Sequence, residues 1–401
     1  MKELRKELVL MSFIGVLLIT GCGNTTEKTE NPSDTVQVGA IEEDWSQLFI
    51  RQSGWFGGDG IFGIPMDGRE YYPATEETVT LFTFGDTMIG EHDGKTLDPD
   101  RFYMVNNSVG ILEGNKPDPS RIEFHYDKDE NGDPKPLFIP NSDHSKPGDY
   151  YWLGDGFVNV ASDSSLNIYA YRIHEIDTAG KGGFAFEQVG VDLITIPRAS
   201  APPFTDHVQI KTPLFDKDTE TTFGSAIFVN TEWAGAPNPD GYIYTYAVSK
   251  LRGVKGLIVG RAKAETYTDF STWTFYDGSG WDKDMMNSAM IAEHVSNEMS
   301  VSPLPDGSIL LVYQFMTMGK EVVVQKGESL VGPFEERKTI FIADENDRDS
   351  NYFSYNAKAY PHLSPEGHVL LSYNVNSFDF WNDILEDPNL YRPRFVQWKV
   401  D

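Results

Sequence analysis

Three acidic residues stand in sequence contexts that suit chemistry better than simple solvation. Asp59 lies in the motif Gly-Gly-Asp-Gly, Asp86 in Phe-Gly-Asp-Thr, and Glu298 in Asn-Glu-Met-Ser at the start of an apolar run. A buried carboxylate without a partner is costly, so such a group is paired, exposed to solvent or functional. When carboxyl groups crowd into a partly desolvated pocket, their pKa values separate, and one group can stay protonated at neutral pH while its neighbour is ionised.

Two carboxyl groups in these two states are what glycoside hydrolysis requires. One protonates the leaving oxygen, and the other either activates a water molecule or attacks the sugar carbon, so inverting and retaining mechanisms both remain open. We assign Glu298 as the acid and Asp59 as the base or nucleophile. Asp86 is expected to tune or orient Asp59, and it is also an alternative base.

A recurring hairpin motif indicates the elements that would position these residues. Its clearest copies are Leu-Pro-Asp-Gly-Ser before the β-prone run 309–313 and Leu-Ser-Pro-Glu-Gly-His before the run 369–373. Fainter copies carry Asp67-Gly68, Asp163-Ser164 and Asp240-Gly241, and successive turns are 96, 77, 66 and 60 residues apart. Glycine accepts the positive φ of tight hairpin turns, so each copy predicts a pair of antiparallel strands.

Five such units predict an all-β fold, a five-bladed β-propeller of four-stranded antiparallel blades. A single blade cannot bury its own faces and must pack on its neighbours in a ring. The last strand, near residues 394–400, is expected to complete the first blade, which would remove exposed sheet edges. A β-sandwich or a pair of smaller β-domains is the alternative fold.

In a propeller, the start of each inner strand and the end of the second strand lie at the same end of the central channel. This geometry places Asp59 beside Asp86, although 27 residues separate them in the sequence. It also adds Asp155, Glu298 and Lys358 from other blades. We therefore expect carboxylates from several blades to share one mouth.

Further residues near this mouth are candidates for substrate binding. The rings of Trp55 and Trp152 could stack on sugars, or they could pack in the core between blades. Asp155 and Lys358 could contact substrate, although an aspartate before glycine often only caps its own turn. His207 could lie near the axis as a proton donor, or it could be an ordinary polar loop residue.

Several motifs together resemble those of five-bladed propeller glycosidases. They are Gly-Gly-Asp-Gly, Phe-Gly-Asp-Thr, Val-Asn-Asn-Ser at 105–108, Asn-Glu-Met-Ser-Val at 297–301, Ala-Lys at 357–358 and Tyr-Arg-Pro-Arg-Phe at 391–395. They are most similar to domains of formerly unknown function that include endo-acting D-arabinofuranan hydrolases, and the resemblance covers about residues 45–401. It implies a carbohydrate-cleaving enzyme with acidic catalysts on the inner strands, and a substrate contact from Asn107.

The sequence therefore predicts a glycoside hydrolase that cleaves an extracellular polysaccharide, with an arabinofuranose-containing glycan as the leading specific substrate. The main alternative is a non-catalytic surface protein that binds glycans on the same propeller, because aromatic rings alone suffice for binding. A lyase or a purely structural component of the cell envelope is the third.

The N-terminus predicts export and lipid attachment. Three basic residues among the first six precede an apolar run over residues 9–20 that is too short to span a membrane stably, which is typical of a signal peptide over residues 1–21. Leu-Ile-Thr-Gly-Cys at 18–22 resembles the lipobox of bacterial lipoproteins, so Cys22, the sole cysteine, is expected to carry lipid. The lipid would anchor the protein in the cell envelope, facing outside the cytoplasm. The alternative is a buried free cysteine after an ordinary signal peptide. Residues 22–44 are polar and predict a flexible tether, which leaves 45–401 as a single propeller domain.

Composition excludes several partners. The net charge of −28 repels phosphate backbones, so nucleic acid is not expected to bind. The eight histidines show no zinc-like spacing, and there is neither a cysteine pair nor a Gly-Lys-Ser/Thr phosphate loop, so no metal or nucleotide cofactor is predicted. Residues 127–133 imitate the opening of a calcium loop, but Phe138 stands where a glutamate should close it. A solvated hairpin tip is therefore expected there in preference to a calcium site.

Overall fold

The protein is described by a computed structural model that covers residues 39–176 and 186–400, so the predicted signal peptide and Cys22 lie outside it. Strand content is 47% and helical content 8%, which confirms the all-β class. Within the covered ranges no helix is both long enough and apolar enough to cross a membrane.

The described residues form five sheets of four or more strands. The first contains β2 (Ser53–Pro65), β3 (Val79–Glu91), β5 (Ser108–Glu113) and β6 (Ile122–His125), with β4 (Phe102–Val105) also paired to β3. The second contains β9 (Asp149–Val158), β10 (Leu166–Glu175), β11 (Phe186–Ile196) and β12 (Val208–Lys211). The third contains β13 (Phe215–Asp216), β14 (Thr221–Asn230), β15 (Tyr242–Ser249), β16 (Gly256–Lys263), β17 (Thr274–Tyr276), β18 (Trp281–Asp282) and β19 (Ala292–Glu293).

The last two sheets come from the C-terminal third of the chain. The fourth contains β20 (Met299–Pro303), β21 (Ile309–Gln314), β22 (Glu321–Gly327) and β23 (Lys338–Ile342). The fifth contains β24 (Tyr352–Ala359), β25 (His368–Ser377), β26 (Pro393–Lys399) and β1 (Ala40–Ile41). The connections carry short helices, α2 (Glu43–Gln47), α3 (Glu345–Arg348) and α4 (Phe380–Glu386), and the 3-10 turns η3 (Ala264–Thr266), η4 (Phe270–Thr272), η5 (Met285–Asn287) and η6 (Pro361–Leu363).

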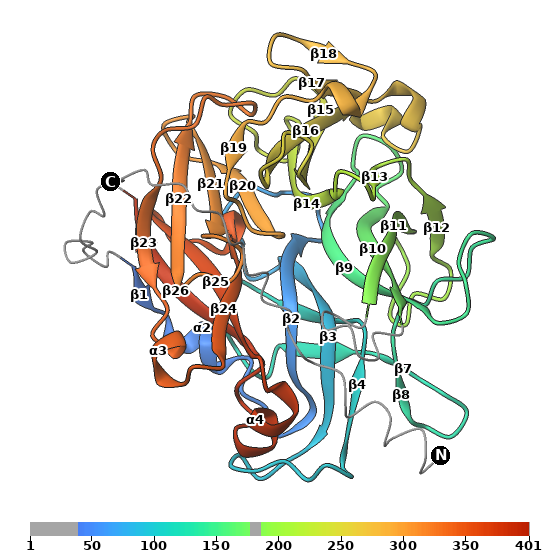
Figure 1. Cartoon of the computed structure of the whole chain (residues 1–401), viewed down its shortest axis with the longest axis vertical. Coiled ribbons are helices and arrows are strands. Elements are labelled where there is room, and N and C mark those ends of the chain that lie inside the picture. The colour runs from blue at the N-terminus through green and yellow to red at the C-terminus, as the bar shows by residue number, and fades with distance from the viewer. Residues whose placement is uncertain (1–38, 177–185, 401) are drawn as a thin grey trace, which may run out of the picture.

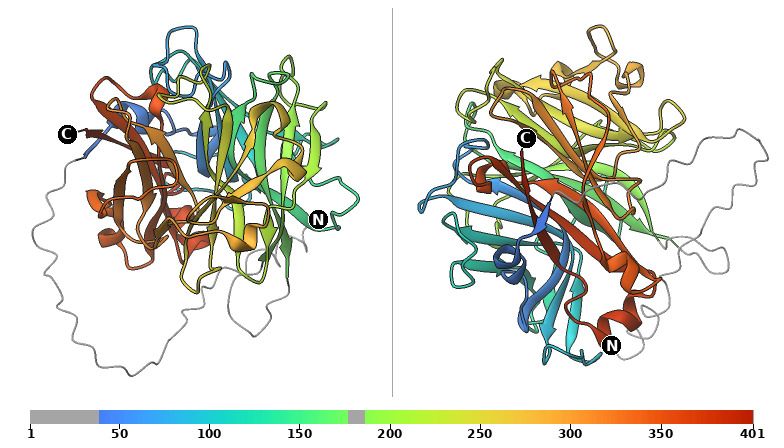
Figure 2. Two further views of the ribbon diagram at one scale, coloured as in Figure 1. Left: turned by 90° about the horizontal axis from the view of Figure 1, so that it is seen from above. Right: turned by 90° about the vertical axis from the view of Figure 1, so that its left-hand side faces the viewer.

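The sheets follow one another around a common axis. The inner strands contact each other in the cycle β2, β9, β14, β20, β24 and back to β2. Figure 1 shows β2, β9, β20 and β24 near the middle of the molecule, with β12, β18 and β23 at its periphery. In Figure 2 the orange and red sheets and the green sheets lie on opposite sides. The arrangement confirms a propeller.

Hydrophobic side chains fill the space between neighbouring sheets, which is what holds the ring together. Ile64 and Ile168 pack between the first and second sheets, and Leu310 and Leu371 between the fourth and fifth. The other clusters likewise each join two neighbouring sheets. Each sheet therefore depends on the two beside it.

The propeller has four blades and not the predicted five. The described ranges do contain five sheets of four or more strands, but only three of these have four strands. The first has five strands because β4 also pairs with β3, and the third has seven because short strands extend it at both edges. The prediction of five uniform four-stranded blades is therefore wrong, although the propeller itself is confirmed.

The predicted hairpins are all present. Each turn joins the first two long strands of a different sheet, and each has one residue at positive φ. These residues are Gly68 (φ 73°), Ser164 (φ 59°), Gly241 (φ 76°), Gly307 (φ 85°) and Gly367 (φ 71°). The predicted hairpin tip at 127–133 is also confirmed, as the loop between β7 (Asp127–Lys128) and β8 (Pro134–Lys135).

The prediction that the last strand completes the first blade is wrong. β26 does not join the first sheet, because it stays beside its chain neighbour β25 in the fifth. The free edge of β26 is covered by β1, with Ala40 opposite Gln397 and Ile41 opposite Val396. The predicted tether, residues 22–44, therefore extends too far, since the fold already includes Ala40.

The hairpin turns offer a matched test of packing between sheets. A Cβ atom at Gly68 would lie 2.7 Å from Val160 Cγ2 and 3.2 Å from the carbonyl oxygen of Val158, whereas a Cβ at Gly307 would have no heavy atom within 4 Å. Gly307→Ala is expected to lower the free energy of unfolding by about 1–2 kcal/mol because of its positive φ. Gly68→Ala is expected to cost about 1–3 kcal/mol more because of the clash. Urea unfolding measures both, and equal losses would contradict close packing of the first two sheets at this turn.

Candidate functional site

Inner strands from four sheets bring charged side chains into one group. Asp59 lies on β2, Asp155 on β9, Glu298 directly before β20, and Lys358 on β24. Asp86 joins them from β3, the second strand of the first sheet. The four carboxyl residues are half-buried, and the side chain of Lys358 is 1% exposed. The predicted convergence of these five residues is thus present in the structure.

A β-bulge places Asp59 against Asp86. Gly58 pairs with Thr87 and Gly60 pairs with Phe84, so Asp59 lies opposite both Gly85 and Asp86. The bulge needs its glycines, because a Cβ atom on Gly85 would lie 2.8 Å from Asp59 Oδ1, and Gly60 has a φ of +86°. The Gly-Gly-Asp-Gly and Phe-Gly-Asp-Thr motifs are therefore the two halves of one local structure.

Two phenol groups bind Asp59. Tyr355 donates a hydrogen bond from its hydroxyl to Asp59 Oδ2 at 2.8 Å, and the hydroxyl of Tyr391 forms a second bond. Burial raises the pKa of Asp59 above 3.8, while these bonds and the charge of Lys358 oppose the rise. The phenols thus favour the ionised form of Asp59.

Asp86 has neutral partners only. Trp152 donates from Nε1 to Asp86 Oδ1 at 2.9 Å, and Asn106 donates from Nδ2 at 3.2 Å. Burial, together with the neighbouring charge of Asp59, raises the pKa of Asp86 to about 7. This carboxyl group therefore changes its protonation state near neutral pH.

Glu298 and Lys358 form an ion pair. The Nζ atom of Lys358 contacts Glu298 Oε2, donates to the carbonyl oxygen of Gly60, and lies 3.9 Å from the ring centroid of Phe62. Burial raises the pKa of Glu298 to about 7 against the opposing effect of Lys358, and burial also lowers the pKa of Lys358. The pair joins the fourth and fifth sheets and contacts the first.

Asp155 is held mainly by the backbone. It accepts hydrogen bonds from the amide of Gly156 at 2.8 Å and from the amide of Ile227, on β14, at 2.7 Å. Burial raises its pKa to about 7. These bonds tie the second sheet to the third, as expected if Asp155 mainly holds the backbone. Its charge also acts on Lys358.

Three predicted binding residues lie outside this group. Trp55 is 2% exposed and stacks on Phe124 at 4.4 Å, so the core alternative holds for it. Asn107 is fully buried, and its amide bonds to the backbone of Phe138 and Tyr151.

His207 precedes β12, the outermost strand of the second sheet, where Nδ1 contacts the carbonyl oxygen of Phe204 at 2.8 Å. It is not near the axis, because this loop returns along the outer edge of the sheet. Trp152, in contrast, lies at the carboxyl groups, where its Nε1 donates to Asp86.

Three residues that contact the carboxyl groups were not predicted as site residues: Asn106, Tyr355 and Tyr391. All three lie in or beside motifs that had been singled out, so the signal was available. The missing information was which of two adjacent side chains faces the axis, as with Asn106 and Asn107. Within residues 39–176 and 186–400, no cluster of three or more His, Cys, Asp or Glu residues is arranged to hold a metal ion.

The geometry supports acid–base chemistry. One carboxyl group is stabilised in its ionised form by phenols, and others titrate at about 7, within one half-buried site. Pairs of carboxyl groups whose environments separate their pKa values can act as base and acid in the same reaction.

Two solved structures are similar to this chain, and the first of them supports the fold. A protein from Bacteroides ovatus ATCC 8483, provisionally described as a hydrolase, is 20% identical, with 89% of each chain covered and a TM-score of 0.67. An endo-arabinase from Bacteroides thetaiotaomicron VPI-5482 is 10% identical, with 85% of this chain and 97% of that chain covered and a TM-score of 0.41.

No curated protein matches the sequence at a significant level. The sequence model of one family, described as "Domain of unknown function (DUF5005)", matches residues 42–399. The match spans nearly the whole propeller, and the chain therefore belongs to the DUF5005 family.

Proposed function

We propose that this protein is a glycoside hydrolase that cleaves a polysaccharide through paired carboxyl groups. The observation that carries the proposal is the meeting of Asp59 and Glu298, from different sheets, in one half-buried site with Lys358. The likeness in fold to the Bacteroides ovatus protein, provisionally described as a hydrolase, agrees with it.

The roles follow from the partners of each group. Asp59, with two phenol donors, is the ionised group that activates water or attacks the sugar carbon. Glu298, whose pKa is raised to about 7, donates its proton to the leaving oxygen as the glycosidic bond breaks. Asp86 lies against Asp59, and a negative charge on either carboxyl group makes ionisation of the other less favourable. Asp86 therefore tunes the pair.

For the substrate we propose a neutral polysaccharide, with an arabinofuranose-containing glycan as the first to test. The half-buried ring of Trp152, fixed by its bond to Asp86 and by edge contacts with Tyr150 and Phe186, offers an aromatic surface beside the carboxyl groups. Sugars stack on such rings through their apolar faces.

Asp59→Asn and Glu298→Gln are each expected to lower polysaccharide hydrolysis at least about a hundredfold, because each removes one half of the acid–base pair. Release of reducing ends from a panel of arabinans, galactans and host glycans measures the rate, and affinity electrophoresis measures binding separately. Glu293→Gln, at an exposed position of β19, is the matched control and should keep the wild-type rate. A wild-type protein that binds a glycan but releases no sugar would show a binding protein instead, and full activity of Asp59→Asn would exclude this site.

The rate on polysaccharide is expected to fall on both sides of a pH optimum. Above about 7 Glu298 loses the proton that it must donate, and at low pH Asp59 gains a proton at a pH above its ordinary 3.8. An aryl glycoside with a good leaving group needs no proton, so Glu298→Gln should cleave it at close to the wild-type rate and without the alkaline fall. An equal loss on both kinds of substrate would remove Glu298 from the role of acid.

We also propose that the propeller is held at the outer face of a bacterial membrane by lipid on Cys22, through a tether that ends before β1. The support is the lipobox-like segment at 18–22 in the sequence. Expressed in a bacterium fed a clickable palmitate analogue, the wild-type chain should be labelled and sediment with membranes, whereas Cys22→Ser should do neither. Equal labelling of both chains would contradict attachment at this residue.

A further inference from the structure

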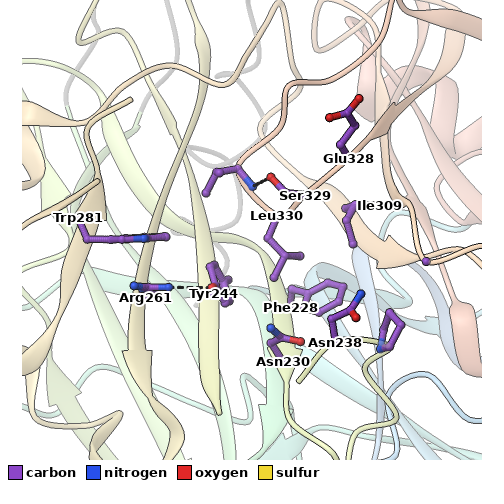
Figure 3. A pocket seen from close by; sticks show the side chains of 13 residues that line it. Phe228, Asn230, Asn238, Tyr244, Arg261, Trp281, Ile309, Glu328, Ser329 and Leu330 are labelled. Atoms are coloured by element: carbon purple, nitrogen blue, oxygen red, sulfur yellow. Dashed lines mark hydrogen bonds between the residues drawn. The ribbon is translucent and has the colours of Figure 1, made fainter. Parts of the chain in front are cut away.

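A hollow lies between the third and fourth sheets, apart from the carboxyl groups. It has a volume of about 290 Å³, and none of the five charged site residues lines it. Its walls come from β14, β15, β16 and β18 on one side and from β21 and the loop after β22 on the other. Figure 3 shows the side chains of Asn230, Tyr244, Arg261, Trp281 and Leu330 around it.

One wall of this hollow is aromatic and rigid. The rings of Tyr244 and Trp281 meet edge to face with centroids 5.7 Å apart. The guanidinium group of Arg261 lies 3.8 Å from the centroid of Trp281 and 4.2 Å from that of Tyr242, and its Nη1 donates to the Tyr244 hydroxyl at 3.0 Å. These contacts hold the rings in place before any ligand arrives, which lowers the entropy cost of binding.

Two polar groups of the hollow lack partners. Asn230 is 5% exposed, and its side-chain amide lines the cavity with no hydrogen-bond partner in the described parts of the chain. The Nε atom of Arg261 is also buried without a partner among those residues. Buried donors and acceptors are normally satisfied, so these groups are suited to a ligand rich in hydroxyl groups.

The charges around the hollow favour a neutral ligand. Arg261 lies 3.8 Å from Asp240, Lys263 lies beside them, and Glu328 lines the opposite wall. Two positive and two negative groups therefore balance locally. The net charge of −28 on the whole chain further repels anionic polymers.

We propose that this hollow is a second glycan-binding site, which holds a sugar unit of a neutral polysaccharide apart from the site of cleavage. The half-buried ring of Trp281 stacks on the sugar through the face that Arg261 does not cover, and the amide of Asn230 bonds to the hydroxyl groups of the sugar. The proposal rests on the proposed function in one respect, that the bound glycan is also the substrate. A polymer bound in this hollow has a raised effective concentration at the carboxyl groups. An oligosaccharide too short to span both sites gains no such advantage.

The test combines binding and activity. In a Glu298→Gln background, where cleavage does not consume the ligand, Trp281→Ala and Asn230→Ala are each expected to weaken polysaccharide binding about tenfold, or about 1.4 kcal/mol, in affinity electrophoresis and calorimetry. In the active protein the same changes should lower the rate on the polymer but leave the rate on a trisaccharide unchanged. Trp233→Ala is the matched control, because Trp233 is 50% exposed but lies outside this hollow.

The outcomes separate the two proposals. If the wild-type protein cleaves nothing but Trp281→Ala still loses binding, the hydrolase proposal fails and the glycan site stands. If neither Trp281→Ala nor Asn230→Ala weakens binding, or if Trp233→Ala weakens it as much, or if no glycan binds, the second site is overturned. Trp281→Phe keeps an aromatic ring and should retain most of the affinity. If Trp281→Ala lowers the melting temperature, Asn230→Ala decides the test instead, because the Asn230 side chain forms no hydrogen bond whose loss would destabilise the fold.

Discussion

Four carboxyl groups and one ammonium group share the centre of the ring, and the rest of the site depends on the contacts of that ammonium group. Lys358 pairs with Glu298 of the fourth sheet, bonds to the backbone of Gly60 in the first, and belongs itself to the fifth. When Glu298 is neutral, the buried ammonium group still has the charges of Asp155 and Asp59 near it, whereas the carboxyl groups without Lys358 lose the one cation of the group and destabilise the fold strongly. One buried contact therefore sets the spacing of three sheets and the environment of Asp59.

The carboxyl groups make the site a costly part of the fold. Burial holds the pKa values of Asp86, Asp155 and Glu298 at about 7, so their ionisation opposes folding as the pH rises from the ordinary carboxyl range toward that value. One cation cannot neutralise four such groups. A propeller that needed only stability would fill the same positions with apolar side chains, and this cost is a reason to propose a function for the charges.

Much of this architecture could be predicted from local chemistry, because turns and strand order act over short ranges. The hairpins at Gly68 and Gly307 follow from the turn geometry of glycine, and the meeting of Asp59 with Glu298 follows from the topology of inner strands. What could not be predicted is the face on which a side chain lies when the register shifts. β2 has three such irregularities within 13 residues, which is why Trp55 points into the core while Asp59 faces the axis.

The same limit explains the errors at Asn107 and His207. Asn106 and Asn107 lie in the bend between β4 and β5, where Asn106 reaches Asp86 and Asn107 reaches the backbone of Phe138, and no periodic pattern fixes the direction of either side chain. His207 depends on the path of a loop, which no periodic pattern specifies. The prediction of five uniform blades is wrong for a related reason, because β4 and the short strands around β16 are additional strands that no hairpin motif marks in the sequence.

The pairing of β1 with β26 governs when the molecule can be completed. Ala40 and Ile41 form the first strand of the described chain, and the edge that they cover, at Val396 and Gln397, belongs to its last strand. About 355 residues must be enclosed before these two ends meet, and closing so long a loop carries a large entropic cost and slows folding. Until β26 pairs with β1, the sheets therefore form an open array in which the edge at Val396 and Gln397 is uncovered.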